Sequence, residues 1–366
     1  MNFGFTAEQD MLRDQVRRFL DENCPLPEVR NIMKQTAGFS PELWQQMAGL
    51  GWLGLIIPAE YGGVGLFWED LIVILEETGR SLFPSPLISN TLAASTLVEL
   101  GSEDQKKHWL PGIANGKTIA ACAILDEDDC PDLDNITLAI SPDGTLSGIK
   151  PFVPDAGNAD LLVVAFRDGD GFGLALIGKT QNGVTVSSTG TMDKSKRSGT
   201  LTLDGVQVDA GQRINCDAQA MTRLLDKGSV AVAAEMVGAA ETVLEMTSQY
   251  AKDRIQFGAP IGKYQGVKHR LAEIYLDIES FKSLVYYAAW TVDQSPEALA
   301  RSASIAKAYA SDAFVAIGIE GVQLHGAIGF TAEYDVQLFL KRSKWARPMF
   351  GDADYHYERV AALGGL

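Results

Sequence analysis

The stretch Arg254-Ile255-Gln256-Phe257-Gly258-Ala259-Pro260-Ile261-Gly262-Lys263-Tyr264-Gln265 lies between two long helical patterns. It places a fixed cation and an aromatic ring at the end of one predicted helix and an amide at the start of the next. Glycine and proline restrict the backbone between them to a tight turn. Arg254 can form charge-assisted hydrogen bonds to a phosphate, and Gln265 can hydrogen-bond a heterocycle or a ribose. Because cations also favour helix C-termini, Arg254 could instead only cap its helix.

The chain on both sides of this stretch has helical periodicity. After Leu224, recurring Ala and Leu predict helices through Lys252, from Tyr264 to Asp293 and from Pro296 to Ile319. The first of these helices carries small residues that allow close contact with its neighbours, namely Ala233, Gly238 and Ala239. The pattern therefore predicts a C-terminal helical bundle with a tight core.

Upstream of the bundle the pattern changes twice. From about Thr118 to about Asp209, short β-branched or apolar runs alternate with Gly, Asp and Asn, which predicts a small antiparallel β domain. The first third is again helical, and Thr6 with Gln9 has the spacing of a capping box. Two further helices are expected after Ser40 and from Trp68, with a glycine-rich loop over 58–65 between them.

Composition narrows the class of protein. The 366 residues include 47 acidic and 31 basic side chains, which gives a net charge of −16, and 46% are hydrophobic. This excludes a fully disordered chain and argues against nucleic acid, because phosphate binding needs clusters of Lys and Arg. The cysteines have no paired spacing, which indicates buried reduced thiols at Cys24, Cys122, Cys130 and Cys216. Without a basic-apolar leader or a long unbroken apolar run, the chain is expected to be cytoplasmic and not to span a membrane.

The stretch at 254–265 resembles the flavin-binding signature of the acyl-CoA dehydrogenase family, R-x-x-F-G-x-P-I-x-x-x-Q. A second match follows at 323–330, where Gln-Leu-His-Gly-Ala-Ile-Gly-Phe is similar to the family's Q-x-x-G-G-x-G-[FY]. Supporting matches are Gly51-Trp52 through Gly65 and Trp109-Leu110-Pro111 before Gly116. The resemblance covers essentially the whole chain and agrees with the helix, β, helix order.

The resemblance implies a fold and a cofactor. The fold is α+β and acyl-CoA dehydrogenase-like, with an N-terminal helical domain at 1–117, a middle β-domain at 118–215 and, at 216–366, a C-terminal helical bundle of four helices. FAD would lie at a subunit interface, its isoalloxazine held by one chain and its pyrophosphate and adenine reached by a neighbour. Carried over, the neighbour's contacts are Arg254, Gln256, Phe257, Ile261, Tyr264, Gln265, Gln323, Gly326 and Ala327. Ala327 stands where a second glycine is usual, and we expect its methyl to be tolerated.

The implied reaction is α,β-dehydrogenation of an acyl-CoA thioester, in which a carboxylate removes the α proton and the β hydrogen leaves as hydride. In the commonest family pattern the base is a glutamate, but the register puts Gly351 at that position. The other family position, on the helix before the arginine signature, falls near Gly228 and also has no glutamate. Asp352 is a weak candidate, and the helix acids are expected to face solvent or a subunit contact: Glu235, Glu241 and Glu245.

The half of the family site that holds the isoalloxazine is also changed. The expected T-E-P-x-[AG]-G-S-D segment corresponds to 125–131, which holds four successive acids, and the W-I-[TS] strand corresponds to Lys150-Pro151-Phe152-Val153-Pro154. Loss of this half with retention of both interface signatures predicts a subunit that completes the FAD site of a different partner chain.

The 350–356 ending resembles the shorter subunits of two-gene acyl-CoA dehydrogenases, including those acting on steroid side chains and dicarboxyl-CoA chains. The partner would then be a paralogous subunit in an α2β2 assembly, with electron-transfer flavoprotein as acceptor and an unusual or bulky acyl group as substrate. Two alternatives stay open: a self-sufficient homotetramer using Asp352 or a helix acid, and a non-catalytic scaffold. The alternation Asp352, Asp354, His356 is interpreted as solvated polar residues and not as a metal site.

Overall fold

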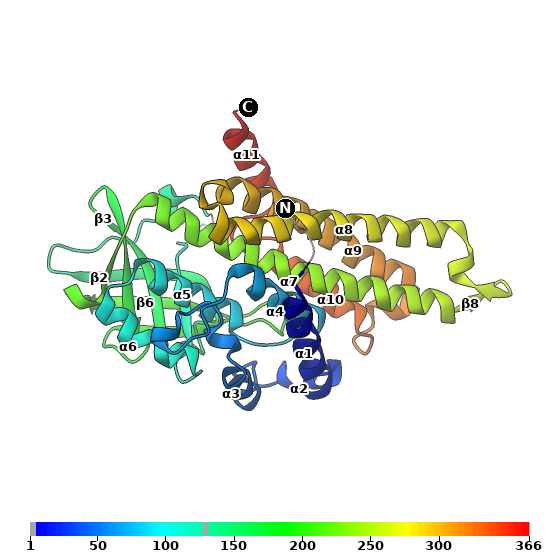
Figure 1. Cartoon of the computed structure of the whole chain (residues 1–366), viewed down its shortest axis with the longest axis horizontal. Coiled ribbons are helices and arrows are strands. Elements are labelled where there is room, and N and C mark those ends of the chain that lie inside the picture. The colour runs from blue at the N-terminus through cyan, green and yellow to red at the C-terminus, as the bar shows by residue number, and fades with distance from the viewer. Residues whose placement is uncertain (1–4, 127–130, 366) are drawn as a thin grey trace. The chain divides into compact units, whose positions relative to one another are not determined.

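Helix α7 (Ala218–Asp253) is the longest element of a computed structural model that describes residues 5–126 and 131–365. The chain divides into a helical unit, formed by Met1–Arg30, Trp68–Phe83 and Ser229–Leu366, and a β unit, formed by Asn31–Phe67 and Pro84–Gly228. Helix α7 contributes to both units (Figure 1). The structure thus divides the chain differently from the predicted boundaries at 117 and 215, which stay a prediction.

The helical unit is organised around helix α9 (Leu299–His325), on which α8 (Gln265–Gln294), α10 (Val336–Ala346) and α11 (Ala353–Gly364) pack (Figure 1). By length and composition alone, Pro296–Phe330 could cross a membrane, a feature that the sequence analysis did not identify. In this unit α9 is a core helix whose buried face includes polar side chains: Ser302, Ser304, Lys307 and Ser311.

The N-terminal part of the helical unit holds α1 (Ala7–Asn23), α2 (Leu26–Ile32) and α4 (Trp68–Arg80). The predicted capping box is confirmed. The Thr6 side chain accepts a hydrogen bond from the Gln9 backbone N–H, and the Gln9 side chain accepts one from the Thr6 backbone N–H. Helices α4 and α7 touch at Gly238, where a Cβ would collide with the backbone carbonyl of Glu76. The close helix contact predicted at Gly238 is therefore confirmed.

Two sheets make up most of the β unit. One contains β1 (Ala120–Ala123), β3 (Leu161–Asp168), β4 (Gly171–Gly178) and β7 (Arg213–Cys216), in the order β1-β3-β4-β7. The other contains β2 (Thr145–Pro154), β6 (Ser198–Gln207) and β5 (Val184–Thr189), in that order. All pairings within these sheets are antiparallel except β1 with β3, which is parallel and departs from the expected antiparallel domain.

Helices α3 (Pro41–Gly49), α5 (Leu87–Leu100) and α6 (Glu103–Ala114) complete the β unit. Helix α3 begins after Ser40 as predicted, since the Ser40 side chain accepts from the Leu43 backbone. The described cysteines, Cys24, Cys122 and Cys216, are buried free thiols, and Cys130 lies outside the described residues.

Candidate functional site

The turn after α7 is a short β-hairpin. Strand β8 (Ile255–Gln256) pairs antiparallel with β9 (Ala259–Pro260). The two residues between them, Phe257 and Gly258, have φ of 52° and 78°. Positive φ at both positions is the geometry of a type I′ turn, which suits glycine and is uncommon for phenylalanine. A strained non-glycine residue at a turn points to a functional constraint on its side chain.

Tyr264 supports this turn. Its hydroxyl donates to the carbonyls of Gln256 at 3.2 Å and Phe257 at 3.3 Å, and its ring lies edge-on to the Phe257 ring at 6.4 Å. Phe257 itself is 95% exposed. Because a large apolar ring is held in solvent on a fixed turn, packing within this chain does not explain it, and contact with a ligand or another chain does.

Arg254 follows the last residue of α7, and its side chain is exposed. Within residues 5–126 and 131–365, its guanidinium makes no hydrogen bond or ion pair, so it does not cap the carbonyls of its helix. The segment 252–270 carries five basic side chains and one acidic side chain, in a chain with a net charge of −16. This local excess of positive charge favours an anion at the hairpin.

The second motif begins on the last turn of α9. Gln323 is exposed there, and Gly326 takes φ 65°, which only glycine adopts readily. Ala327 lies exposed in the 3-10 turn Gly326–Phe330, and its φ is not positive. Its methyl group therefore meets no backbone restriction, as we expected.

A stack of aromatic rings joins the two motifs. The rings of Tyr250 and His325 lie 4.4 Å apart, and Tyr334 packs against His325 at 5.0 Å. The His325 Nδ1–H donates to the Gly321 carbonyl at 2.7 Å, and burial lowers the pKa of the ring below its ordinary value. Since Tyr250 precedes Arg254 by one helical turn, the structure brings the hairpin and the glycine motif together.

Most of the predicted cofactor contacts lie at this one end of the helical unit. Gln256, Tyr264 and Gln265 are exposed beside Arg254 and Phe257, whereas Ile261 is half-buried in the turn before α8. A guanidinium, two exposed amides and an exposed ring on a fixed hairpin can hold an anionic, aromatic ligand such as a nucleotide. The described residues contain no group of three or more His, Cys, Asp or Glu side chains placed to hold a metal ion.

The position expected to hold the base has a backbone that strains any residue other than glycine. Gly351 takes φ 105°, and a Cβ there would lie 2.5 Å from Cδ1 of Tyr355 and 2.9 Å from Nε2 of His356. Asp352 accepts the Tyr355 backbone N–H at 3.0 Å and caps α11. Its carboxylate is thus already used at a helix N-terminus, which weakens it further as a candidate base.

Two buried side chains hold this turn. Lys307 is fully buried and donates to the carbonyls of Arg347 and Gly351, both at 2.8 Å. Burial lowers its pKa to about 7. His356 donates from Nε2 to the Phe350 carbonyl at 3.1 Å, and burial lowers its pKa to about 3. The loop is therefore anchored at the carbonyls of Arg347, Phe350 and Gly351.

The helix acids are engaged in ion pairs. Glu245 pairs with Arg80 at 2.6 Å and is exposed, and the half-buried Glu241 contacts Lys282. The expectation that Glu235 faces solvent or a subunit contact is wrong, because it is 2% exposed and lies 3.2 Å from Arg342 inside the helical unit. The reason is that α10 supplies a buried guanidinium opposite it, which pattern analysis of α7 alone cannot show.

The strand expected to hold the isoalloxazine is β2 of the β unit. Lys150 is fully buried, forms an ion pair with Asp126 and donates to the Ile124 carbonyl at 2.9 Å. Phe152 sits at an irregularity of β2 with φ 53° and is 49% exposed, while Pro154 offers no N–H or hydroxyl. The acids at 127–129 lie outside the described residues.

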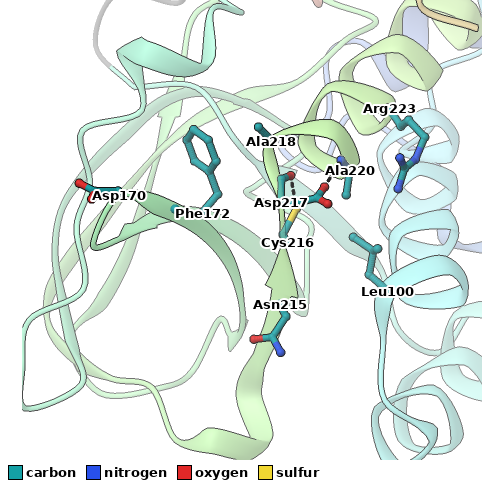
Figure 2. A pocket seen from close by; sticks show the side chains of 10 residues that line it. Leu100, Asp170, Phe172, Asn215, Cys216, Asp217, Ala218, Ala220 and Arg223 are labelled. Atoms are coloured by element: carbon teal, nitrogen blue, oxygen red, sulfur yellow. Dashed lines mark hydrogen bonds between the residues drawn. The ribbon is translucent and has the colours of Figure 1, made fainter.

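A separate cavity of about 600 Å³ opens in the β unit (Figure 2). The Asp217 carboxylate in its wall accepts the Ala220 backbone N–H at 2.7 Å, and Arg223 pairs with Glu99 at 2.7 Å. Burial raises the pKa of the Cys216 thiol to about 12, so it is not a thiolate. None of the predicted cofactor residues lines this cavity, and the Asp217 and Arg223 side chains are already paired within the unit, so it is not our candidate site.

Sequence reasoning did not find the residues that support the site. Tyr250 stands one turn before Arg254 on the same helix, a spacing that could have identified it. Lys307 stands in an otherwise small and apolar stretch of α9, where a lone charge is a signal of a specific partner. No sequence pattern around Tyr334 indicated its role.

Family models match most of the chain. The N-terminal domain of acyl-CoA dehydrogenase matches residues 6–117, and its C-terminal domain matches residues 218–364. The chain belongs to the acyl-CoA dehydrogenase family. The predicted α+β fold class, the oxidoreductase activity on acyl-CoA and FAD as the cofactor are thereby confirmed.

Relatives cover this chain from end to end. Acyl-CoA dehydrogenase IpdE2 of Mycolicibacterium smegmatis is 31% identical over 98% of this chain and 99% of its own length. Among solved structures, a variant of the Tcur3481-Tcur3483 steroid ACAD has a TM-score of 0.90 and 29% identity, covering 98% of both chains. The ChsE4-ChsE5 complex from Mycobacterium tuberculosis has a TM-score of 0.92 and 26% identity, covering 100% of this chain and 99% of that one.

Proposed function

We propose that this chain is a subunit of an FAD-dependent acyl-CoA dehydrogenase and that it completes the FAD site of a paralogous partner chain. The observation that carries the proposal is Gly351: the family position of the base has no carboxylate, and the φ of 105° and the crowding by Tyr355 and His356 would strain one placed there. The partner would supply the carboxylate that removes the α proton.

In this proposal the exposed hairpin binds the dinucleotide end of FAD. Arg254 donates in a charge-assisted manner to the diphosphate, and Gln265 and Gln323 hydrogen-bond polar groups of the nucleotide. The Phe257 ring, held out on its type I′ turn, packs against the partner or the nucleotide. When bound, FAD supplies the acceptor for the hydride that leaves the β carbon.

The β unit also supports the proposal that the partner, and not this chain, holds the isoalloxazine. Lys150 of β2 is paired with Asp126, and Pro154 ends the strand, where an isoalloxazine needs hydroxyl and amide donors. A partner chain would hold the isoalloxazine with its own β domain. This chain would supply the dinucleotide contacts from its hairpin and its glycine motif.

Two of the similar structures are named for pairs of proteins, and one of these is called a steroid enzyme. This supports an α2β2 assembly and a bulky acyl group, such as a steroid side chain or a dicarboxylic chain, as substrate. Electron-transfer flavoprotein is the proposed electron acceptor, and the cytoplasm is the proposed location.

The test is the visible spectrum of the purified chain, alone and after assembly with a candidate paralogue. A colourless chain that gains flavin and turnover only in the complex supports the proposal. A full flavin complement with turnover by the chain alone would instead identify a self-sufficient homotetramer. A complex whose flavin content and activity do not depend on Arg254 would identify a scaffold.

A screen of straight-chain, dicarboxylic and steroid-side-chain CoA esters tests the substrate class. Equal rates on short straight chains would contradict a bulky acyl group as substrate.

A further inference from the structure

A single arginine from the N-terminal part of the chain holds the loop that follows the glycine motif. Arg30, on α2, donates from Nε and Nη2 to Oδ1 of Asp335 at 2.9 and 2.7 Å. The same guanidinium donates to the carbonyl of Ala332 at 2.8 Å and to those of Glu333 and Tyr334 at 3.3 and 3.2 Å. One planar fork thus binds a carboxylate and three consecutive carbonyls.

The backbone of this loop depends on the contact with Arg30, because the two residues before Tyr334 are exposed and give it little packing. Ala332 and Glu333 are exposed, and the segment 331–335 belongs to no helix or strand. Three carbonyls in a row point at Arg30, and without it they would be left to solvent. Arg30 therefore fixes the path of the loop between the glycine motif and α10.

Tyr334 carries this constraint to the proposed nucleotide site. Its ring lies 5.0 Å from that of His325 and 6.3 Å from that of Tyr250. His325 is 2% exposed beneath it and stands between Gln323 and Gly326. Tyr250 stands one turn before Arg254. The loop thus closes one side of the stack that links the two motifs.

We propose that Arg30 is a positioning residue of the nucleotide-binding end of this chain: by fixing the 331–335 loop it holds Tyr334 on the His325–Tyr250 stack and so sets the relative placement of Arg254 and Gln323. This inference rests on the proposed function. Arg30 does not itself contact the cofactor. The competing explanation is that Arg30 only anchors α2 to the helical unit and has no effect on nucleotide binding.

The experiment compares Arg30→Ala and Arg30→Lys in the assembled enzyme, with Arg80→Ala as the matched control. Arg80 also forms a two-pronged pair, with Glu245 at 2.9 and 2.6 Å, in the same unit, and in the described part of the chain it does not contact the loop. FAD affinity is measured by titrating the deflavinated enzyme, and melting temperature is measured in parallel. We expect Arg30→Ala to weaken FAD binding about tenfold. Arg30→Lys should recover melting temperature but not affinity, because a single ammonium cannot bind all the acceptors.

A second readout reports on the loop directly. The ring of His325 is followed by NMR in protein with isotope-labelled histidine. Loosening of Tyr334 should admit water and move the pKa of His325 up toward its ordinary value in Arg30→Ala but not in Arg80→Ala. Tyr334→Ala should reproduce the affinity loss, and combining it with Arg30→Ala should add little, because both act through one contact.

The outcomes separate this inference from the proposed function on which it rests. If Arg254→Ala loses FAD affinity while Arg30→Ala and Tyr334→Ala retain it, Arg30 is only an anchor and the inference is overturned while the proposed function stands. If Arg254→Ala also retains full affinity, the proposed function falls and the inference falls with it. If Arg30→Ala does not fold, Arg30→Lys and Tyr334→Ala decide the question by the same measurements.

Discussion

The ring of Tyr250 lies on the ring of His325, with centroids 4.4 Å apart and planes inclined by 32°. The Tyr250 carbonyl accepts the backbone N–H of Arg254 at 2.8 Å, and His325 is followed directly by Gly326. One contact between two side chains thus fixes the spacing between motifs that are far apart in the sequence. It also explains why the pKa of His325 is lowered, because stacked rings exclude the water that an imidazolium needs.

Replacing Tyr250 with Ala should separate the two motifs. We expect a loss of about 1 to 3 kcal/mol in the free energy of unfolding, since an aromatic contact and its buried area both disappear. FAD affinity should fall as well. Tyr250→Phe keeps the stack and should behave as the unchanged chain in urea denaturation and FAD titration. An alanine variant that binds FAD normally would show that the stack does not position the motifs.

Substitution of Gly351 tests the turn at the base position. Gly351→Ala should cost about 1 to 3 kcal/mol of stability, because its positive φ strains any other residue and the methyl meets the Tyr355 ring. Gly364 provides a control, since a Cβ there meets nothing within 4 Å and its φ is not positive. Denaturation of Gly364→Ala should show little change.

Gly351→Glu extends the same test to chemistry. The crowded turn should prevent the new carboxylate from reaching the position that a base requires, so the chain alone should gain no dehydrogenase activity. Turnover by this variant without a partner would contradict the proposed division of labour. The assay is reduction of an artificial electron acceptor in the presence of acyl-CoA.

Buried His356 predicts how stability depends on pH. Its pKa is lowered to about 3 by burial, whereas an unfolded histidine titrates near 6.5. Between these values the unfolded state binds the additional proton, so the free energy of unfolding falls as pH decreases from about 6.5 toward 3. Above 6.5 this contribution is fully present. Urea denaturation at pH 7 and pH 5 measures the effect.

His356→Gln removes the group responsible. The variant should be less stable at pH 7, since the contact with the Phe350 carbonyl is altered, but it should lose less stability between pH 7 and pH 5 than the unchanged chain. An identical pH dependence in both proteins would show that His356 is not buried in neutral form.

Local patterns predicted much of the fold because caps and periodicity are set by neighbouring residues. The box at Thr6 and Gln9 and the helix start at Ser40 are confirmed for this reason. The resemblance placed a strand at 150–154, within β2, although Pro151 and Pro154 argue against a strand in the local pattern. The structure accommodates them because β2 lies at the edge of its three-stranded sheet and its pairing with β6 is irregular between Lys150 and Val153.

The sequence likewise predicted some residues of the candidate site and not others. The motif residues at 254–265 and 323–327 could be named from the sequence, and their role in binding FAD stays a prediction. The contact between Arg30 and Asp335, which holds the loop after the second motif, could not be named, because the two residues are 305 positions apart. Nor could the sequence show that Gly351 adopts a backbone closed to other residues, since this follows from the packing of Tyr355 and His356.

Arg254 gives the most direct test of the site. Its side chain is exposed and has no partner among the described residues, so Arg254→Ala should leave the melting temperature nearly unchanged. If the guanidinium binds the FAD diphosphate across an interface, its loss should weaken FAD binding by about 1.5 to 3 kcal/mol, because a charge-assisted bond is removed and a phosphate oxygen is left underpaired. Arg254→Lys should recover part of this, since it keeps the charge but not the planar fork. The measurements are the FAD content of the assembled enzyme and the melting temperature of the chain without FAD, because bound FAD would itself raise the melting temperature. A helix-capping role predicts the reverse pattern, a small loss of stability with a full flavin complement, and that result would refute the cofactor role of the hairpin.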